Sequence, residues 1–130
     1  MKYEVAKQWI TALRSDEYPQ CTNQLRQDGS YCCLGVLTDL FIKNNEVNAE
    51  ARASWEAQGA YVDSEGVREA FSLPQDVIKW AGVKGSDPHT VYYSEDECED
   101  SEQWATQLND DEHWSFQQIA NWVEENWEVL

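Results

Sequence analysis

An almost unbroken apolar run at residues 31–42, YCCLGVLTDLFI, is the feature that most constrains the fold of this chain. Its spacing predicts a buried helix over about 32–44. The residues that share one face of this helix are Cys33, Leu37, Leu40 and Phe41. Because glycine costs about 1 kcal/mol inside a helix relative to alanine, Gly35 indicates that another backbone approaches the helix closely at this point.

Two amphipathic helices are predicted near the ends of the chain. The first covers about residues 3–14, and its apolar positions are Val5, Ala6, Trp9, Ile10 and Leu13. The second begins at Ser115, an N-cap residue, and Gln118 completes a capping box. Trp114 and Ile119 are spaced for a hydrophobic staple at the same end. The expected buried positions of this helix are Phe116, Ile119, Ala120, Val123 and Trp127.

The segment between the first two helices predicts a less regular structure. Residues 20–31 favour an irregular or hairpin-like conformation with a tight turn at Asp28-Gly29. Residues 48–57 have a composition compatible with a helix. Two short strands on either side of Gln58-Gly59 are an open alternative for this part of the chain.

The second half of the chain predicts one more helix and a strand. The helix covers about residues 74–81, with Pro74 at its first position and Gly82 after its last turn. A short strand is expected over 90–93, and an acidic loop follows it at about 94–103.

The length and composition fit a single globular domain over residues 1–130. Apolar residues make up 42% and aromatic residues 12% of the chain, which is too many for a disordered protein. No repeat or linker divides it. We expect an α+β fold in which three main helices pack with a short antiparallel sheet or hairpin.

Charge is distributed very unevenly along the chain. The sequence has 25 acidic and 9 basic residues, for a net charge of −16. Every lysine and arginine lies within residues 1–84, so residues 85–130 carry acids only. This balance excludes direct binding to a nucleic-acid backbone or to an anionic membrane surface, because both need an excess of positive charge.

The densest acidic segment has six acids within residues 94–102. Its candidate partner-binding residues are Glu95, Asp96, Glu97, Glu99, Asp100 and Glu102, followed further along by Asp110, Asp111 and Glu112. A solvated loop is one interpretation, and adaptation to high salt is another. A third is a surface that meets a positively charged protein, because a field of this size steers association.

Signatures of catalysis or metal binding are absent from the sequence. The four cysteines form no CxxC pair, and the two histidines stand in no recognisable catalytic context. Cys32 and Cys33 are expected to be free thiols in the core. No glycine-rich phosphate loop occurs, and the acids at 110–112 would bind a divalent cation only adventitiously. We therefore expect no enzyme activity, no cofactor and no specific metal site.

A cluster of arginines, amides and phenols is a candidate small-molecule site. Its members are Arg14, Tyr18, Gln20, Gln24, Arg26 and Tyr31. Guanidinium groups bind anions through paired hydrogen bonds, and phenols stack on heterocycles. Ordinary salt bridges in an arginine-poor protein are the alternative explanation.

The N-terminal segment and the hydropathy favour a cytoplasmic location without membrane contact. No apolar run approaches the roughly 20 residues of a spanning helix. The segment at residues 1–15 carries charges where a signal peptide needs an uninterrupted apolar stretch. The sequence leaves the oligomeric state open, and a small homo-oligomer is compatible with it.

Several of these segments together resemble a family of small proteins from tailed bacteriophages and prophages. The matching segments are WITALRS at 9–15, YCCLGVL at 31–37, Leu73-Pro74, WAG at 80–82, LND at 108–110, Ser115-Phe116 and Ile119-Ala120. The chain departs from the pattern at Thr38, where that family usually has another cysteine, and in its dense acidic segment. The resemblance implies a phage origin and no particular activity.

Two function hypotheses follow. In the first, the chain is a non-enzymatic phage accessory protein for host takeover or counter-defence. It acts in the cytoplasm of the infected host, where its acidic surface binds and blocks a basic, nucleic-acid-binding host protein. In the second, a pocket near Arg14 and Arg26 sequesters a nucleotide-derived signal. A virion or assembly component is a further possibility.

Overall fold

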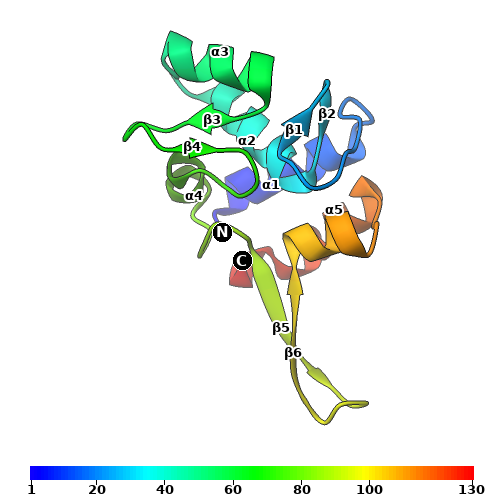
Figure 1. The fold of residues 1–130 in the computed structure, drawn as a ribbon. Helices are drawn as coiled ribbons and strands as arrows, with labels where there is room; N and C mark the ends of the chain where they lie inside the picture. Colours follow the sequence, from blue (N-terminus) through cyan, green and yellow to red (C-terminus); the bar gives the residue numbers. More distant parts are fainter.

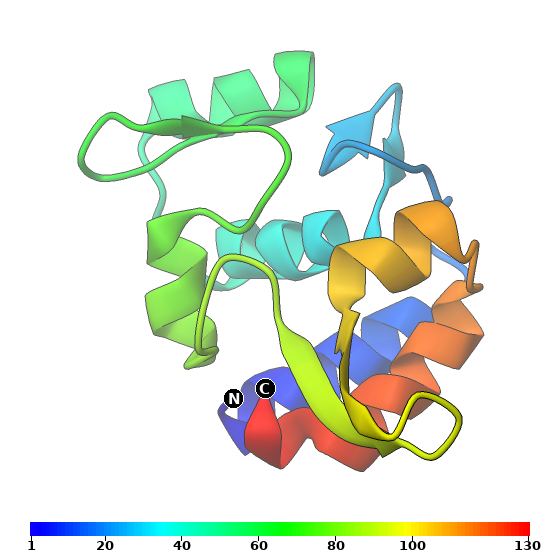
Figure 2. The ribbon, with the colours of Figure 1, turned by 60° about the horizontal axis from the view of Figure 1, so that its bottom comes forward.

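The apolar run forms helix α2 (Cys33–Asn44), which crosses the middle of the molecule in the computed structural model of residues 1–130 (Figures 1 and 2). Most of its residues are buried, as expected of a helix that is apolar nearly all round. The Cys32 side chain caps the helix, because its sulfur accepts a hydrogen bond from the Gly35 amide. Cys32 and Cys33 are buried free thiols, so this prediction is confirmed.

Two amphipathic helices, α1 (Tyr3–Arg14) and α5 (Phe116–Asn126), pack side by side below α2 (Figure 2). The Trp9 indole donates a hydrogen bond to the carbonyl of Cys33, which ties α1 to the start of α2. The predicted capping box of α5 is present with both of its hydrogen bonds. One buried position was predicted wrongly, because Trp127 begins the short 3₁₀ turn η2 (Trp127–Val129) and is only half-buried. Trp122 is buried on α5 instead.

The other face of α2 is covered by smaller elements. These are strands β1 (Arg26–Gln27) and β2 (Ser30–Tyr31), helix α3 (Ala49–Gln58), strands β3 (Tyr61–Val62) and β4 (Arg68–Glu69), and helix α4 (Gln75–Ala81). The helical alternative for residues 48–57 is therefore the one that the structure adopts. Asn48 caps α3, and Gly59 ends it in the left-handed conformation at φ 67°. Pro74 is the N-cap of α4 rather than its first helical residue.

The remaining strands, β5 (His89–Ser94) and β6 (Glu99–Trp104), form an antiparallel hairpin that precedes the short π-helical segment η1 (Gln107–Asp111). The prediction of a loop at about 94–103 is therefore largely wrong, because only residues 95–98 form a turn between the two strands. Acidic residues are poor strand formers, but here the register pairs Glu99, Asp100 and Glu102 with uncharged residues of β5. The chain is thus an α+β protein with three two-stranded antiparallel sheets.

The glycine in α2 marks a close contact between two backbones, as the sequence predicts. A Cβ atom at Gly35 would overlap the carbonyl group of Leu25. The same Leu25 carbonyl accepts a hydrogen bond from the Cys32 amide at 3.1 Å. The loop before α2 therefore lies directly on the helix, and only glycine allows this.

We predict that Gly35→Ala destabilises the protein by about 1–3 kcal/mol, because the added methyl group must displace backbone rather than a flexible side chain. Gly85→Ala is the matched control, because nothing lies within 4 Å of a Cβ atom there. Urea unfolding followed by tryptophan fluorescence measures both variants. Equal midpoints for the two variants would contradict the predicted overlap.

Candidate functional site

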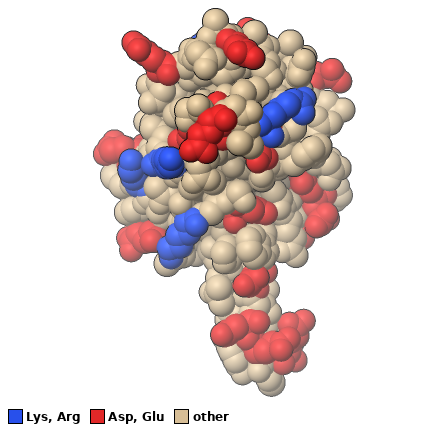
Figure 3. Space-filling model, turned by 60° about the vertical axis from the view of Figure 1, so that its left-hand side comes forward, with Lys and Arg blue, Asp and Glu red and all other residues tan.

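The β5–β6 hairpin projects from the rest of the molecule as an arm (Figures 1 and 3). We call residues 89–104 the acidic arm. The carboxylates that it carries are Glu95, Asp96, Glu97, Glu99, Asp100 and Glu102, all of them exposed. Figure 3 shows acidic side chains gathered toward the tip of this arm. The three ion pairs of the structure lie elsewhere, so no lysine or arginine neutralises these six carboxylates.

Exposed apolar side chains accompany the acids on the arm. Val91 is 59% exposed, Tyr92 47% and Tyr93 61%. The register places Val91 opposite Glu102 and Tyr93 opposite Asp100. The arm therefore presents aromatic and carboxylate groups side by side, a combination suited to contact with cationic side chains.

The other predicted partner-binding acids are not part of this surface. Asp110 and Asp111 lie in η1, beyond the base of β6, and Glu112 follows them. Asp110 is half-buried and accepts a hydrogen bond from the side chain of Asn109. The structure contains no group of three His, Cys, Asp or Glu side chains close enough together to hold a metal ion.

The predicted cluster around Arg14 and Arg26 does not form one pocket. Arg14 pairs with Glu124 of α5 and lines a groove with Tyr3 and Trp127. Arg26 lies over the rings of Tyr31 and Trp55, and it lines a different depression together with Gln24.

One of the two amides of the predicted cluster, Gln20, holds parts of the fold together. Gln20 donates hydrogen bonds to the side chain of Asn109 and to the carbonyl of Trp114. The two tyrosines stay together, because the rings of Tyr18 and Tyr31 meet edge to face at 4.9 Å. The residues predicted to form one site near Arg14 and Arg26 therefore make separate contacts in different parts of the structure.

A buried carboxylate that sequence reasoning missed lies next to these tyrosines. Asp39 is 6% exposed and accepts hydrogen bonds from the Tyr18 hydroxyl at 2.7 Å and the Trp55 indole at 3.0 Å. Lys43, one turn further along α2, neutralises Asp39 at 3.1 Å. Burial is the main cause that raises the pKa of Tyr18 to about 12, and the hydrogen bond to Asp39 adds to it. The sequence signal that could have indicated this buried carboxylate is the spacing of Asp39 and Lys43, four positions apart on the predicted helix.

The cysteines of α2 lack the environment of a nucleophile. Burial raises the pKa of Cys32 to about 12 and raises that of Cys33 well above its ordinary value. Both thiols are therefore protonated at neutral pH, whereas a reactive cysteine needs a thiolate.

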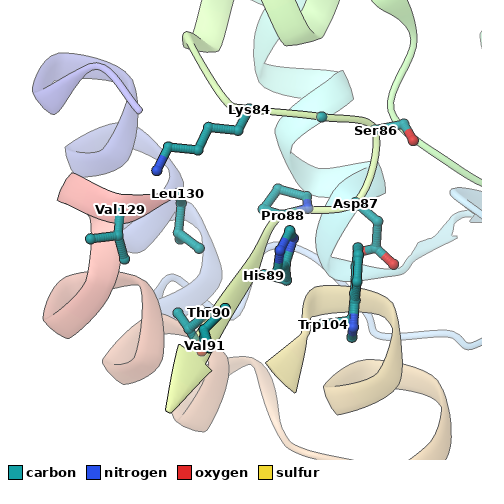
Figure 4. Close-up of a pocket in the computed structure, with 11 residues that line it drawn as sticks. Lys84, Ser86, Asp87, Pro88, His89, Thr90, Val91, Trp104, Val129 and Leu130 are labelled. Carbon is teal, nitrogen blue, oxygen red and sulfur yellow. The ribbon is translucent and has the colours of Figure 1, made fainter. Parts of the chain in front are cut away.

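A cavity of about 490 Å³ lies at the base of the acidic arm (Figure 4). Its lining comes from the loop before β5, from the first half of β5, from Trp104 and from the C-terminal turn. The rings of His89 and Trp104 stack at 3.9 Å and form one wall, and Val129 and Leu130 lie on the other side of β5.

Two polar groups at this cavity have no partner in the protein. The Lys84 amine makes no ion pair. The hydroxyl of Thr90 makes no hydrogen bond within the protein and is open to solvent at the cavity, because Trp122 Nε1 is the only fully buried side-chain N or O atom without a partner. By contrast, Asp87 is engaged with Thr106, and burial raises its pKa. The signal available in the sequence was Lys84, the last cation of the chain, followed closely by one of only two histidines.

A family model described as a domain of unknown function (DUF8296) matches residues 1–127. The chain belongs to the DUF8296 family. No curated protein and no solved structure matches it. The matched range includes the whole acidic arm and all of the cavity lining except Val129 and Leu130, so both features lie essentially within the DUF8296 domain. None of the helices combines the length and apolarity that crossing a bilayer requires.

We predict that this DUF8296 protein loses stability as the pH rises from about 10 toward 12. The folded state holds the Tyr18 proton more tightly than the unfolded chain does, so its contribution is complete below pH 10 and is lost as the pH approaches its folded pKa of about 12. Tyr18→Phe should make the free energy of unfolding fall less steeply with pH. Urea titrations at pH 9, 10 and 11 test this, with exposed Tyr93→Phe as control. An unchanged slope for Tyr18→Phe would contradict the assignment.

Proposed function

We propose that the acidic arm binds a basic protein and that the chain acts by covering that protein's nucleic-acid-binding surface. The observation that carries the proposal is the set of six exposed carboxylates without a single neutralising cation. Unneutralised acids repel one another. The only side-chain hydrogen bonds that these carboxylates accept are two within the arm, from Ser101 to Glu97 and from Trp104 to Glu102. A cationic partner would remove this repulsion, and the carboxylates would take the place of phosphates.

The exposed side chains of β5 support the same proposal. Tyr92 and Tyr93 lie beside the carboxylates, and arginine binds carboxylates in pairs of hydrogen bonds while it stacks on phenol rings. Nucleic-acid-binding proteins concentrate arginine and lysine on one surface. The arm projects from the body of the protein (Figure 1), so it can reach into a groove of such a surface.

The setting that we propose is a phage-infected cell. The resemblance to phage proteins and the charge of the arm together favour a non-enzymatic accessory protein that acts in the host cytoplasm. Its target would be a basic host protein such as a defence nuclease or a transcription factor. Binding would block the target without any chemical change in it.

We predict that neutralising the arm slows association with such a target by about 10-fold or more at low salt. The variant replaces Glu95, Asp96, Glu97, Glu99, Asp100 and Glu102 by Gln or Asn. The fold should persist, because the only hydrogen bonds that these carboxylates accept, from Ser101 to Glu97 and from Trp104 to Glu102, can also be accepted by the amide oxygen of Gln. Host proteins captured by the wild-type chain are identified by mass spectrometry, and their association rates are then measured with both proteins.

The matched control removes six exposed acids from the body of the protein. It combines Asp16→Asn with Gln at Glu17, Glu46, Glu50, Glu56 and Glu65. The wild-type complex should weaken toward an ionic strength of 0.5 M, where the screening length is roughly 4–5 Å. Equal losses in the two neutralised variants, or a complex indifferent to salt, would refute the proposal.

The cavity at the base of the arm favours a second candidate function, the binding of a small anionic molecule. Lys84 would attract the negative charge, and the Thr90 hydroxyl would donate the hydrogen bond that it lacks within the protein. The stacked rings of His89 and Trp104 offer a flat wall to an aromatic or heterocyclic group. This site differs from the one expected near Arg14 and Arg26.

For this second candidate we predict that the protein purified from infected cells carries a small molecule, and that Lys84→Met combined with Thr90→Val abolishes its retention. Mass spectrometry of the denatured protein detects the compound. The double variant Arg14→Ala, Arg26→Ala is the control and should retain it, because these side chains lie away from the cavity. A wild-type preparation free of any specific compound would eliminate this candidate.

A further inference from the structure

The acidic arm has two strand edges with which no other strand of the chain pairs. Strands β5 and β6 form a sheet of only two strands, so each has one unpaired side. An isolated two-stranded hairpin is marginally stable in water, and a third strand or packing against a helix stabilises it. Free edges of this kind are the surfaces to which extended peptides add as new strands.

The register identifies the backbone groups that remain free. The Ala105 amide donates to the Pro88 carbonyl at 2.9 Å, which makes these two residues a hydrogen-bonded pair. Because such pairs alternate along an antiparallel ladder, the pairs formed by residues 90/103, 92/101 and 94/99 are hydrogen-bonded as well. On β6, the amide and carbonyl groups of Asp100, Glu102 and Trp104 therefore point outward to solvent.

The side chains on β6 select what can occupy this edge. Glu99, Asp100 and Glu102 project from both faces of the strand, and the strand contains no lysine or proline. Opposite charges directly across two strands attract, whereas like charges repel. A second copy of the arm that paired through its own β6 would place acid against acid, and one that paired through β5 would offer no cation to the carboxylates. A strand rich in lysine or arginine would place a cation opposite each carboxylate.

We infer that an extended, basic segment of the partner adds to the outer edge of β6 as a third strand. This inference rests on the function proposed for the arm and names its mode of binding. Backbone hydrogen bonds to the outward groups of Asp100 and Glu102 supply the alignment, and the carboxylates supply the selectivity. The edge of β5 is less suited, because its side chains carry no acid and its first half lies beside the C-terminal turn.

A synthetic peptide tests the inference on the intact protein. The probe is an eight-residue peptide of alternating arginine and valine, blocked at both ends. Its matched control has identical side chains but carries a methyl group on every backbone nitrogen, so that it keeps its charge and cannot pair as a strand. Amide hydrogen exchange by NMR reports which edge is covered.

We expect the unmethylated peptide to slow exchange at Asp100 and Glu102 by about tenfold or more, and to leave Val91 and Tyr93 on the β5 edge unchanged. The methylated peptide should bind at least about tenfold more weakly and protect neither edge. Glu102→Pro should weaken binding beyond Glu102→Gln, because proline removes the outward amide at an edge position where it is tolerated.

The outcomes separate this inference from the function on which it rests. If both peptides bind equally well and binding still requires the carboxylates of the arm, contact is by charge alone, so strand addition is wrong and the proposed function stands. If protection falls on Val91 and Tyr93, the edge assigned here is wrong. If neither the peptides nor any basic protein binds the arm, the proposed function fails and the inference fails with it.

Discussion

The contact between Gly35 and the Leu25 backbone is the constraint on which much of the structure depends. It lets the loop of residues 20–31 lie on α2, where the Leu25 carbonyl accepts from Cys32 and the Leu25 amide donates to Ala70. The first turn of α2, the loop directly before it and the distant segment at Ala70 thus meet in one place. A side chain at this glycine would separate all of them, because protein interiors have no room for a displaced backbone.

The same turn of α2 also anchors the acidic arm, through a buried asparagine. Asn109 is 1% exposed and lies in η1, directly after β6. Its side chain accepts hydrogen bonds from the Cys33 amide and from Gln20, and it donates to the carbonyl of Cys21. Because a buried amide that loses its partners is costly, this network holds the base of the arm in a defined place on the core.

The sequence correctly predicted those features of the fold that depend on residues close together in the chain. Helical periodicity located α1, α2 and α5, and the capping box located the start of α5, because these signals depend on residues three or four positions apart. The grouping of Arg14 with Arg26 failed because the partner of Arg14, Glu124, lies 110 positions away and holds it against α5. The cavity likewise could not be predicted from the sequence, because the segments that line it come together only in the folded chain. These segments are residues 84–91, Trp104 and the C-terminal turn.

The acidic arm forms two strands although its acidic residues have a low strand propensity, and the physical reason also bears on how the arm would bind a partner. Its carboxylates would be expected to break a strand, yet the register places no acid across from another: Glu99 faces Ser94, Asp100 faces Tyr93 and Glu102 faces Val91. All the charge on the ladder is therefore confined to β6, and the only β6 residue that lines the cavity is the uncharged Trp104. Such a division lowers cross-strand repulsion enough for the hairpin to form, while it concentrates the negative field along a single free edge. If both strands of the hairpin carried acids, the two strands would repel each other, and the hairpin would be less stable before any partner could bind.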